Sequence, residues 1–270
     1  MHRTGTGVDT TPSLSPLTSL FKHTWRFPSL IVARFILQGY LKSGWILGDI
    51  VLVWLLYAIF YLQFGGNVAY FFGTANPGLS ALAILGTAVM TQRAVNARMY
   101  LLLARLTSRT AYIRGLIFAT GVLRIPTYLL LMILALSYHA FSPPRCGPTC
   151  IDGATFSNML LGSLGLLLNL FIISTLTVLL SRPIATRKIQ IAFLAWLLCV
   201  LYSNGSMGIV AQDLAWTRIP LAPLIICYNL GTTGITSWYE GVMVLFALGY
   251  VVGLTLLAQF LFSRRDLILH

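Results

Sequence analysis

The sequence predicts an all-α integral membrane protein, because the chain is too apolar for a water-soluble domain. Hydrophobic residues make up 57% of its 270 residues, charged residues make up only 9%, and the mean hydropathy is +0.84. Such a chain has too few polar side chains to cover a soluble core. Its apolar residues form long runs near the roughly 20 residues that a helix needs to cross a bilayer. We expect a single membrane domain over residues 29–262, with short tails at 1–28 and 263–270.

Six runs are long enough to be transmembrane helices. They lie at about 45–64, 68–92, 116–138, 156–180, 189–210 and 239–262. The second run contains Pro77, which predicts a kink or a late start, because proline cannot donate a helical hydrogen bond. Residues 1–29 contain no apolar stretch typical of a cleaved signal peptide, so we expect insertion to begin at an internal helix.

The distribution of basic residues predicts the orientation of these helices. Of the eighteen Lys and Arg residues, all but Arg145 and Arg218 fall in the tails or in alternate connections that share one side. Because basic residues accumulate on the cytoplasmic side, we expect a multi-pass protein of the cell (plasma) membrane with both termini in the cytoplasm. The same asymmetry explains the formal charge of +12 without a nucleic-acid partner.

Residues 29–42, "SLIVARFILQGYLK", are apolar but too short to span. At helical spacing Arg34, Gln38 and Lys42 fall on one stripe, and most of the large apolar residues lie outside it. This pattern is typical of a helix that lies in the cytoplasmic membrane interface with its polar edge at the lipid headgroups.

The stretch "RMYLLLARLTSRTAYIRG", from Arg98 to Gly115, is unusually basic for this chain. On a helix Arg98, Arg105 and Arg109 share one ridge. One interpretation is that these arginines only fix topology and bind anionic lipid. The other is that a cytoplasmic helix with a charged ridge docks onto a soluble partner protein. We expect the chain to turn at Gly115 and to enter the third span there.

The apolar segment from Ile219 to Leu230 contains Pro220 and Pro223. Its twelve or so residues are too few to cross the bilayer as a helix. We therefore expect a re-entrant or interfacial segment on the external side before the sixth span.

The polar residues of the spans allow more than one interpretation. Arg124 is expected either to extend toward the cytoplasmic surface or to line a substrate path. Asp49 suits the amino end of the first span for dipole reasons, or it pairs with a basic residue. Like Arg124, it is also a candidate for the substrate path. Cys146 and Cys150 share an external connection and form a candidate disulfide, a pairing that stays open.

Motifs for hydrolytic chemistry are absent from the sequence. It contains no G-x-x-x-x-G-K-[ST] phosphate loop, no H-E-x-x-H and no G-x-S-x-G. We expect that the chain is not an enzyme, binds no metal and holds no cofactor of its own.

Taken together, the amphipathic helix, the six spans, the segment "SRTAYIRG" and the closing "FSRRDL" resemble the type-2 permeases of ATP-binding-cassette exporters. The resemblance covers nearly the whole chain. It implies that 29–42 is an elbow helix and that about 98–109 is a coupling helix bound by a separate ATPase, which handles ATP and Mg. It also implies a second permease chain, identical or related, and a lipid, drug, peptide or polysaccharide cargo. The chain departs from many members because it has no acidic residue between Asp49 and Asp152.

Two other classes of function remain as alternatives. A membrane-embedded enzyme that modifies lipids needs polar residues gathered at one depth, and few are evident in the spans. A non-transporting membrane scaffold needs no such residues, but the sequence offers no soluble domain for a sensor.

Overall fold

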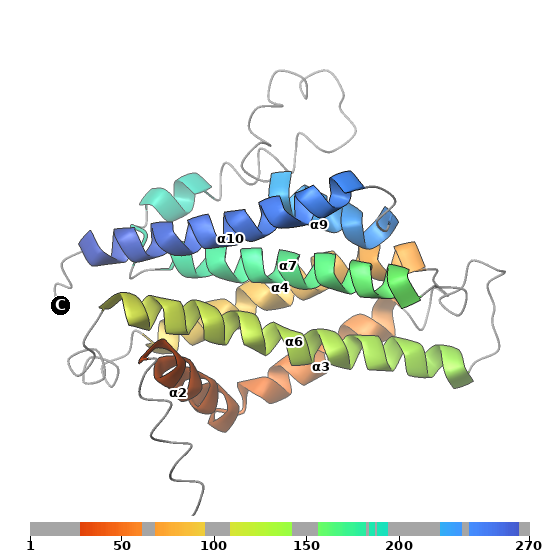
Figure 1. Ribbon diagram of the computed structural model, residues 1–270. Helices are drawn as coiled ribbons and strands as arrows, with labels where there is room; N and C mark the ends of the chain where they lie inside the picture. The colour runs from red at the N-terminus through yellow and green to blue at the C-terminus, as the bar shows by residue number, and fades with distance from the viewer. Residues whose placement is uncertain are drawn as a thin grey trace, which may run out of the picture.

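The computed structural model is helical in every secondary-structure element that it describes, which confirms the predicted all-α class (Figure 1). It describes residues 28–60, 68–94, 109–141, 156–181, 184–186, 188–193, 222–233 and 238–264. The helices are α2 (Pro28–Lys42), α3 (Trp45–Phe60), α4 (Val68–Ala94), α6 (Arg109–Phe141), α7 (Phe156–Leu179), α9 (Ala222–Thr233) and α10 (Trp238–Arg264).

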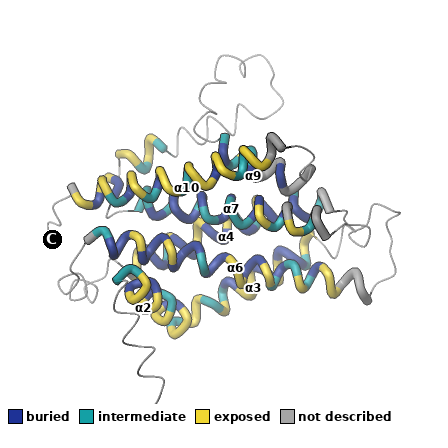
Figure 2. Tube along the Cα trace, in the orientation of Figure 1, coloured by how far each residue is buried: buried dark blue, intermediate teal, exposed yellow. Residues whose placement is uncertain are grey.

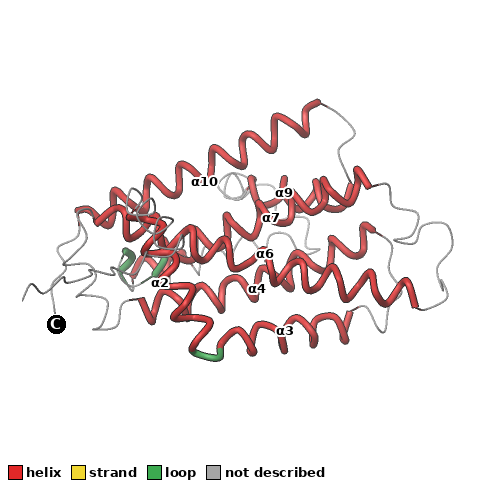
Figure 3. The backbone as a smooth tube through the Cα atoms, turned by 60° about the horizontal axis from the view of Figure 1, so that its bottom comes forward, coloured by secondary structure: helices red, strands yellow, loops and turns green. Residues whose placement is uncertain are grey.

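The long helices run side by side, and α2 crosses them at one end (Figures 1 and 3). At this end α3 and α6 begin, and α4, α7 and α10 end (Figure 1). From α3 to α7 each helix therefore runs opposite to the one before it in the chain, and α10 runs in the same direction as α4 and α7, as the predicted succession of spans requires for these five. The short helix α9 packs against α7, α4 and α10 in the other half of the bundle, where α7 and α10 begin.

The number of spans in the described residues is smaller than six. Four helices are long and apolar enough to cross a membrane, and a fifth span results if α2 and α3 are counted as one bent pair. Helix α3 has only 16 residues, or about 24 Å, and is short for a span. Most of the predicted fifth span, 189–210, lies outside the described residues.

Of two boundary predictions, one was confirmed and one was wrong. Helix α4 begins at Val68, where the second span was predicted to begin, and it continues through Pro77 without a late start. Helix α6 begins at Arg109, seven residues before the predicted span, and Gly115 lies inside it instead of forming a turn. Its 33 residues extend about 50 Å, well beyond a bilayer core of about 30 Å.

Buried apolar residues form three clusters, one of which joins α2 to the first half of α6. The second cluster lies between α3, α4, α6 and α7, and the third joins α7, α9 and α10. Large apolar side chains also cover the outside of the bundle, especially on α3 and α10 (Figure 2). Only 17% of the apolar window of α10 is buried, compared with 44–56% for the other three long spans. This outward-facing apolar surface is what a lipid environment requires.

Candidate functional site at the junction of α2, α3, α4 and α6

Helix α2 ends in a sharp bend that redirects the chain into α3. Gly44 has a φ of +74°, a left-handed conformation that glycine adopts without strain, and the two helix axes differ by 72°. The hydroxyl of Ser43 donates to the Tyr40 carbonyl at 2.6 Å and satisfies one of the last free carbonyls of α2. The bend therefore follows from local chemistry at the end of α2.

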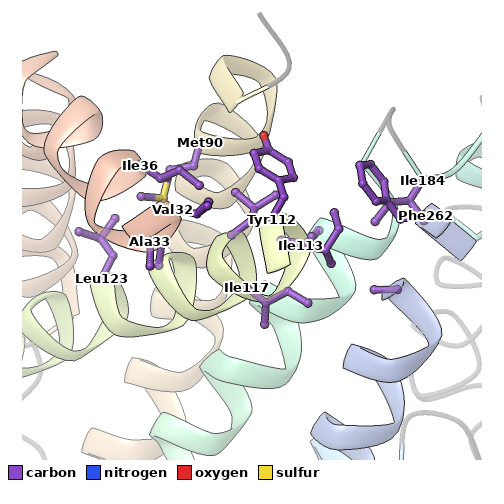
Figure 4. Packing of buried hydrophobic residues seen from close by; sticks show 14 of the residues in the cluster. Val32, Ala33, Ile36, Met90, Tyr112, Ile113, Ile117, Leu123, Ile184 and Phe262 are labelled. Carbon is purple, nitrogen blue, oxygen red and sulfur yellow. The ribbon is translucent and has the colours of Figure 1, made fainter. Parts of the chain in front are cut away.

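One face of α2 is buried against α6. Val32, Ala33 and Ile36 point toward Tyr112, Ile113, Ile117 and Leu123 of α6, together with Met90 of α4 (Figure 4). Arg34, Gln38 and Lys42, the residues expected to form the polar edge of this helix, are all exposed. Helix α2 also exposes apolar side chains, namely Leu30, Ile31, Phe35 and Leu41.

The contact between α2 and α6 depends on Gly115. A Cβ atom at this position would lie 2.6 Å from the Ser29 carbonyl oxygen and 2.8 Å from the Cβ of Val32. Both distances are too short for normal contacts, which begin near 3.5 Å. The glycine that was expected to form a turn instead allows two helix backbones to approach closely.

A buried charged group lies further along α6, near the end of α2. The Tyr40 hydroxyl of α2 donates to the Asp49 carboxylate of α3 at 2.8 Å, and the Arg124 guanidinium of α6 lies 3.8 Å from the same oxygen. Arg124 Nη1 also donates to the Leu82 carbonyl of α4 at 3.4 Å. The side chains of Arg124 and Asp49 are 1% and 6% exposed. We call Tyr40, Asp49 and Arg124 the polar junction.

The polar junction corrects the prediction that Arg124 extends to the cytoplasmic surface, and it selects between the two interpretations of Asp49. Arg124 does not extend to the cytoplasmic surface, because its guanidinium is directed toward Asp49 and the backbone of α4. Asp49 is the fifth residue of α3 and pairs with a basic residue, as one of its two interpretations required. Gly86 provides the space for Arg124, since an added Cβ there would overlap Nη2 of the guanidinium.

Arg124 has fewer partners than its burial would demand. Its Nε and Nη2 atoms are buried without a hydrogen-bond partner, and 3.8 Å is long for a charge-assisted bond, which is about 2.7–2.9 Å. The guanidinium therefore has donors to spare in this arrangement.

A second polar contact joins α4 to α7 further along the bundle. The Asn169 amide donates to the Asn76 side-chain oxygen and, at 3.4 Å, to the Ser80 hydroxyl. The hydroxyls of Tyr128 in α6 and Ser163 in α7 lie 2.5 Å apart. We did not single out these residues from the sequence, although an asparagine in an apolar span is itself a sign of an interhelical hydrogen bond.

The remaining candidate residues are only partly described. Arg98, Arg105, Cys146 and Cys150 lie outside the described residues. Arg109 is the first residue of α6, and nothing is described of its side chain. The described part of the chain brings no three His, Cys, Asp or Glu residues together in a way that could hold a metal ion.

The polar junction can act mechanically, because it places one residue from each of three helices and a carbonyl of a fourth within a few ångströms. Comparison of the chain with family models, characterised proteins and solved structures finds no match. The functional argument therefore depends on the residues and on their geometry.

Proposed function

We propose that this chain is the transmembrane permease subunit of an ATP-binding-cassette exporter, driven by a separate ATPase. The observation that carries the proposal is the position of α2. This amphipathic helix meets α3 at 72° and packs on the first half of α6, into which the basic segment from Arg98 to Arg109 leads. The type-2 permeases that the sequence resembles have an elbow helix before the first span and a coupling helix before the third span.

Six spans with cytoplasmic termini are part of this proposal. The described residues at the start of the predicted fifth span and those that follow it lie in opposite halves of the bundle. Gln190 donates to the Leu180 carbonyl at 2.7 Å, so residues 188–193 lie near the end of α7, whereas α9 lies where α10 begins. The chain between residue 193 and α9 must connect one half of the bundle to the other, which supports an additional span.

The short helix α9 supports the same topology. Its 12 residues are too few to span, and it packs against α7, α4 and α10 directly before α10 starts. A segment that enters the membrane and returns on the external side fits this position, and we propose that α9 is such a segment.

The proposed mechanism begins at the cytoplasmic end of α6. Binding of ATP by the partner would bring two ATPase subunits together and push on the segment 98–109. Because α6 continues from Arg109 for about 50 Å, a push at its first turn would be transmitted along the whole helix. Two permease chains, identical or related, would then open a path outward by rigid-body movement. The cargo classes, which are lipid-like, drug-like, peptide or polysaccharide, come from the resemblance alone.

The proposal is tested by purification of the protein from its native membrane in mild detergent. We expect a protein with a phosphate-binding loop to copurify. Arg105→Glu together with Arg109→Glu is expected to lower its retention about tenfold, equivalent to about 1.4 kcal/mol of binding free energy. The control is Arg182→Glu with Arg187→Glu, which reverses two other basic residues on the same predicted side. If no such ATPase copurifies, or if both double variants behave alike, the proposal is wrong.

A further inference from the structure

The bend between α2 and α3 is bridged by a buried hydrogen bond. Tyr40 lies in the last turn of α2 and Asp49 in the second turn of α3, and their 2.8 Å hydrogen bond crosses the turn at Gly44. Both residues are buried, with 2% and 5% exposure. A carboxylate that accepts a bond in such surroundings holds its partner firmly, because little water competes for it.

The hydrogen bonds of the turn are not the only restraint on this angle. A Cβ at Gly44 would meet no heavy atom within 4 Å, so the turn is not packed against the rest of the protein. Glycine also has access to a wide range of backbone conformations. Contacts away from the turn therefore contribute to the angle, among them the packing of α2 on α6, and Tyr40 with Asp49 is the buried polar contact that crosses the turn.

Arg124 extends this connection to the other helices. It faces Asp49 across 3.8 Å and donates to the Leu82 carbonyl, so α3, α4 and α6 meet at one guanidinium. Its unused Nε and Nη2 donors leave room for a second arrangement in which Asp49 binds the guanidinium with both oxygens. Exchange between the observed arrangement and this second one would make the pair an element that switches between discrete states.

We propose that Tyr40, Asp49 and Arg124 form a latch that sets the angle between α2 and α3 and links it to α4 and α6. A movement of α2 would then change the Asp49–Arg124 pair and be transmitted to α3, α4 and α6. The role of the latch in transport rests on the proposed function, whereas its control of the angle does not.

The latch is tested by a distance measurement across the bend. Spin labels are attached through Leu30→Cys and Ile59→Cys, two exposed positions, after replacement of the native cysteines. The helical rise and the 72° bend predict a backbone separation of about 33 Å, whereas straight alignment would give about 40 Å. Pulsed electron resonance on the chain alone in lipid nanodiscs resolves this difference.

Tyr40→Phe is expected to broaden the distance distribution, and Asp49→Asn is expected to broaden it further toward 40 Å. The matched control is Tyr128→Phe, which removes another interhelical hydroxyl bond, one that joins α6 to α7. If Asp49→Asn does not fold, Asp49→Asn with Arg124→Gln removes both charges and must give the same broadening. Distributions identical to the unmodified protein in folded variants overturn the latch.

Failure of the latch and failure of the proposed function can be told apart. The distance measurement uses no ATPase, so a latch can be confirmed in a chain with which no ATPase copurifies. Conversely, unchanged distances in a chain that retains an ATPase would reject the latch alone.

Discussion

Gly115→Ala is predicted to destabilise the protein, because the contact between α2 and α6 has no space for a side chain. The added Cβ would lie 2.6 Å from the Ser29 carbonyl oxygen, about 1 Å too close, and 2.8 Å from the Cβ of Val32. The first of these is a backbone atom, so α2 must move as a body. Overpacking of this kind costs about 1–3 kcal/mol, whereas the better helix propensity of alanine returns about 0.5–1 kcal/mol.

The assay is the free energy of unfolding, measured by titration of the purified protein with denaturing detergent. The control is Gly253→Ala in α10, where an added Cβ meets no atom within 4 Å. It is the same substitution in a helix of the same bundle, and we expect it to be neutral or slightly stabilising. We predict that Gly115→Ala is at least about 1 kcal/mol less stable than Gly253→Ala. Equal stability of the two variants would refute the close packing of α2 on α6.

Three further predictions concern the buried polar residues and use the same titration. Asp49→Asn leaves the Arg124 charge unpaired and is expected to lower the free energy of unfolding by about 3–5 kcal/mol. The double variant Asp49→Asn with Arg124→Gln should recover most of this loss. A double variant as unstable as the sum of the two single variants would exclude coupling between the residues. Asn169→Leu removes the hydrogen bond to Asn76 and should cost about 1 kcal/mol or less, as interhelical bonds in membranes do; a much larger loss would mean that the α4–α7 contact has another role. Gly86→Ala should displace the Arg124 guanidinium and weaken the coupling energy between Asp49 and Arg124. If a double-mutant cycle on Asp49 and Arg124 gives the same coupling energy with and without Gly86→Ala, the described position of Arg124 is wrong.

The helices that the sequence predicted well are those whose apolar runs are long and uninterrupted. Residues 156–180 and 239–262 were expected as spans, and α7 (Phe156–Leu179) and α10 (Trp238–Arg264) agree with them closely. The α2 segment was also predicted as a helix, because its polar residues repeat at helical spacing. In these cases the lipid environment itself imposes the pattern that is read from the sequence.

Glycine and arginine were harder to interpret, because their roles depend on residues far away in the chain. Gly115 looked like a turn, yet it is required where the Ser29 backbone approaches from α2. Arg124 was expected either at the cytoplasmic surface or on a substrate path, and only the fold brings it to Asp49 and to the Leu82 carbonyl. No local pattern around Arg124 reveals partners that are 75 and 42 residues away in the sequence.

The number of polar residues buried within the bundle was also underestimated from the sequence. The spans seemed to contain few polar side chains at one depth, but Asn76, Asn169 and the polar junction are all buried in the bundle. Since each has a partner on another helix, their hydrogen bonds support a role in helix packing.

The most direct test of the proposed permease is a crosslink from the basic segment to its partner. A photoreactive p-benzoylphenylalanine is placed at Arg105, or at Arg145 in the predicted external connection as the control, and intact cells are irradiated. The account predicts that Arg105, and not Arg145, captures a protein whose sequence contains the phosphate loop G-x-x-x-x-G-K-[ST], identified by mass spectrometry. Crosslinks from Arg105 to lipid alone, or capture of the same proteins from both positions, would contradict it.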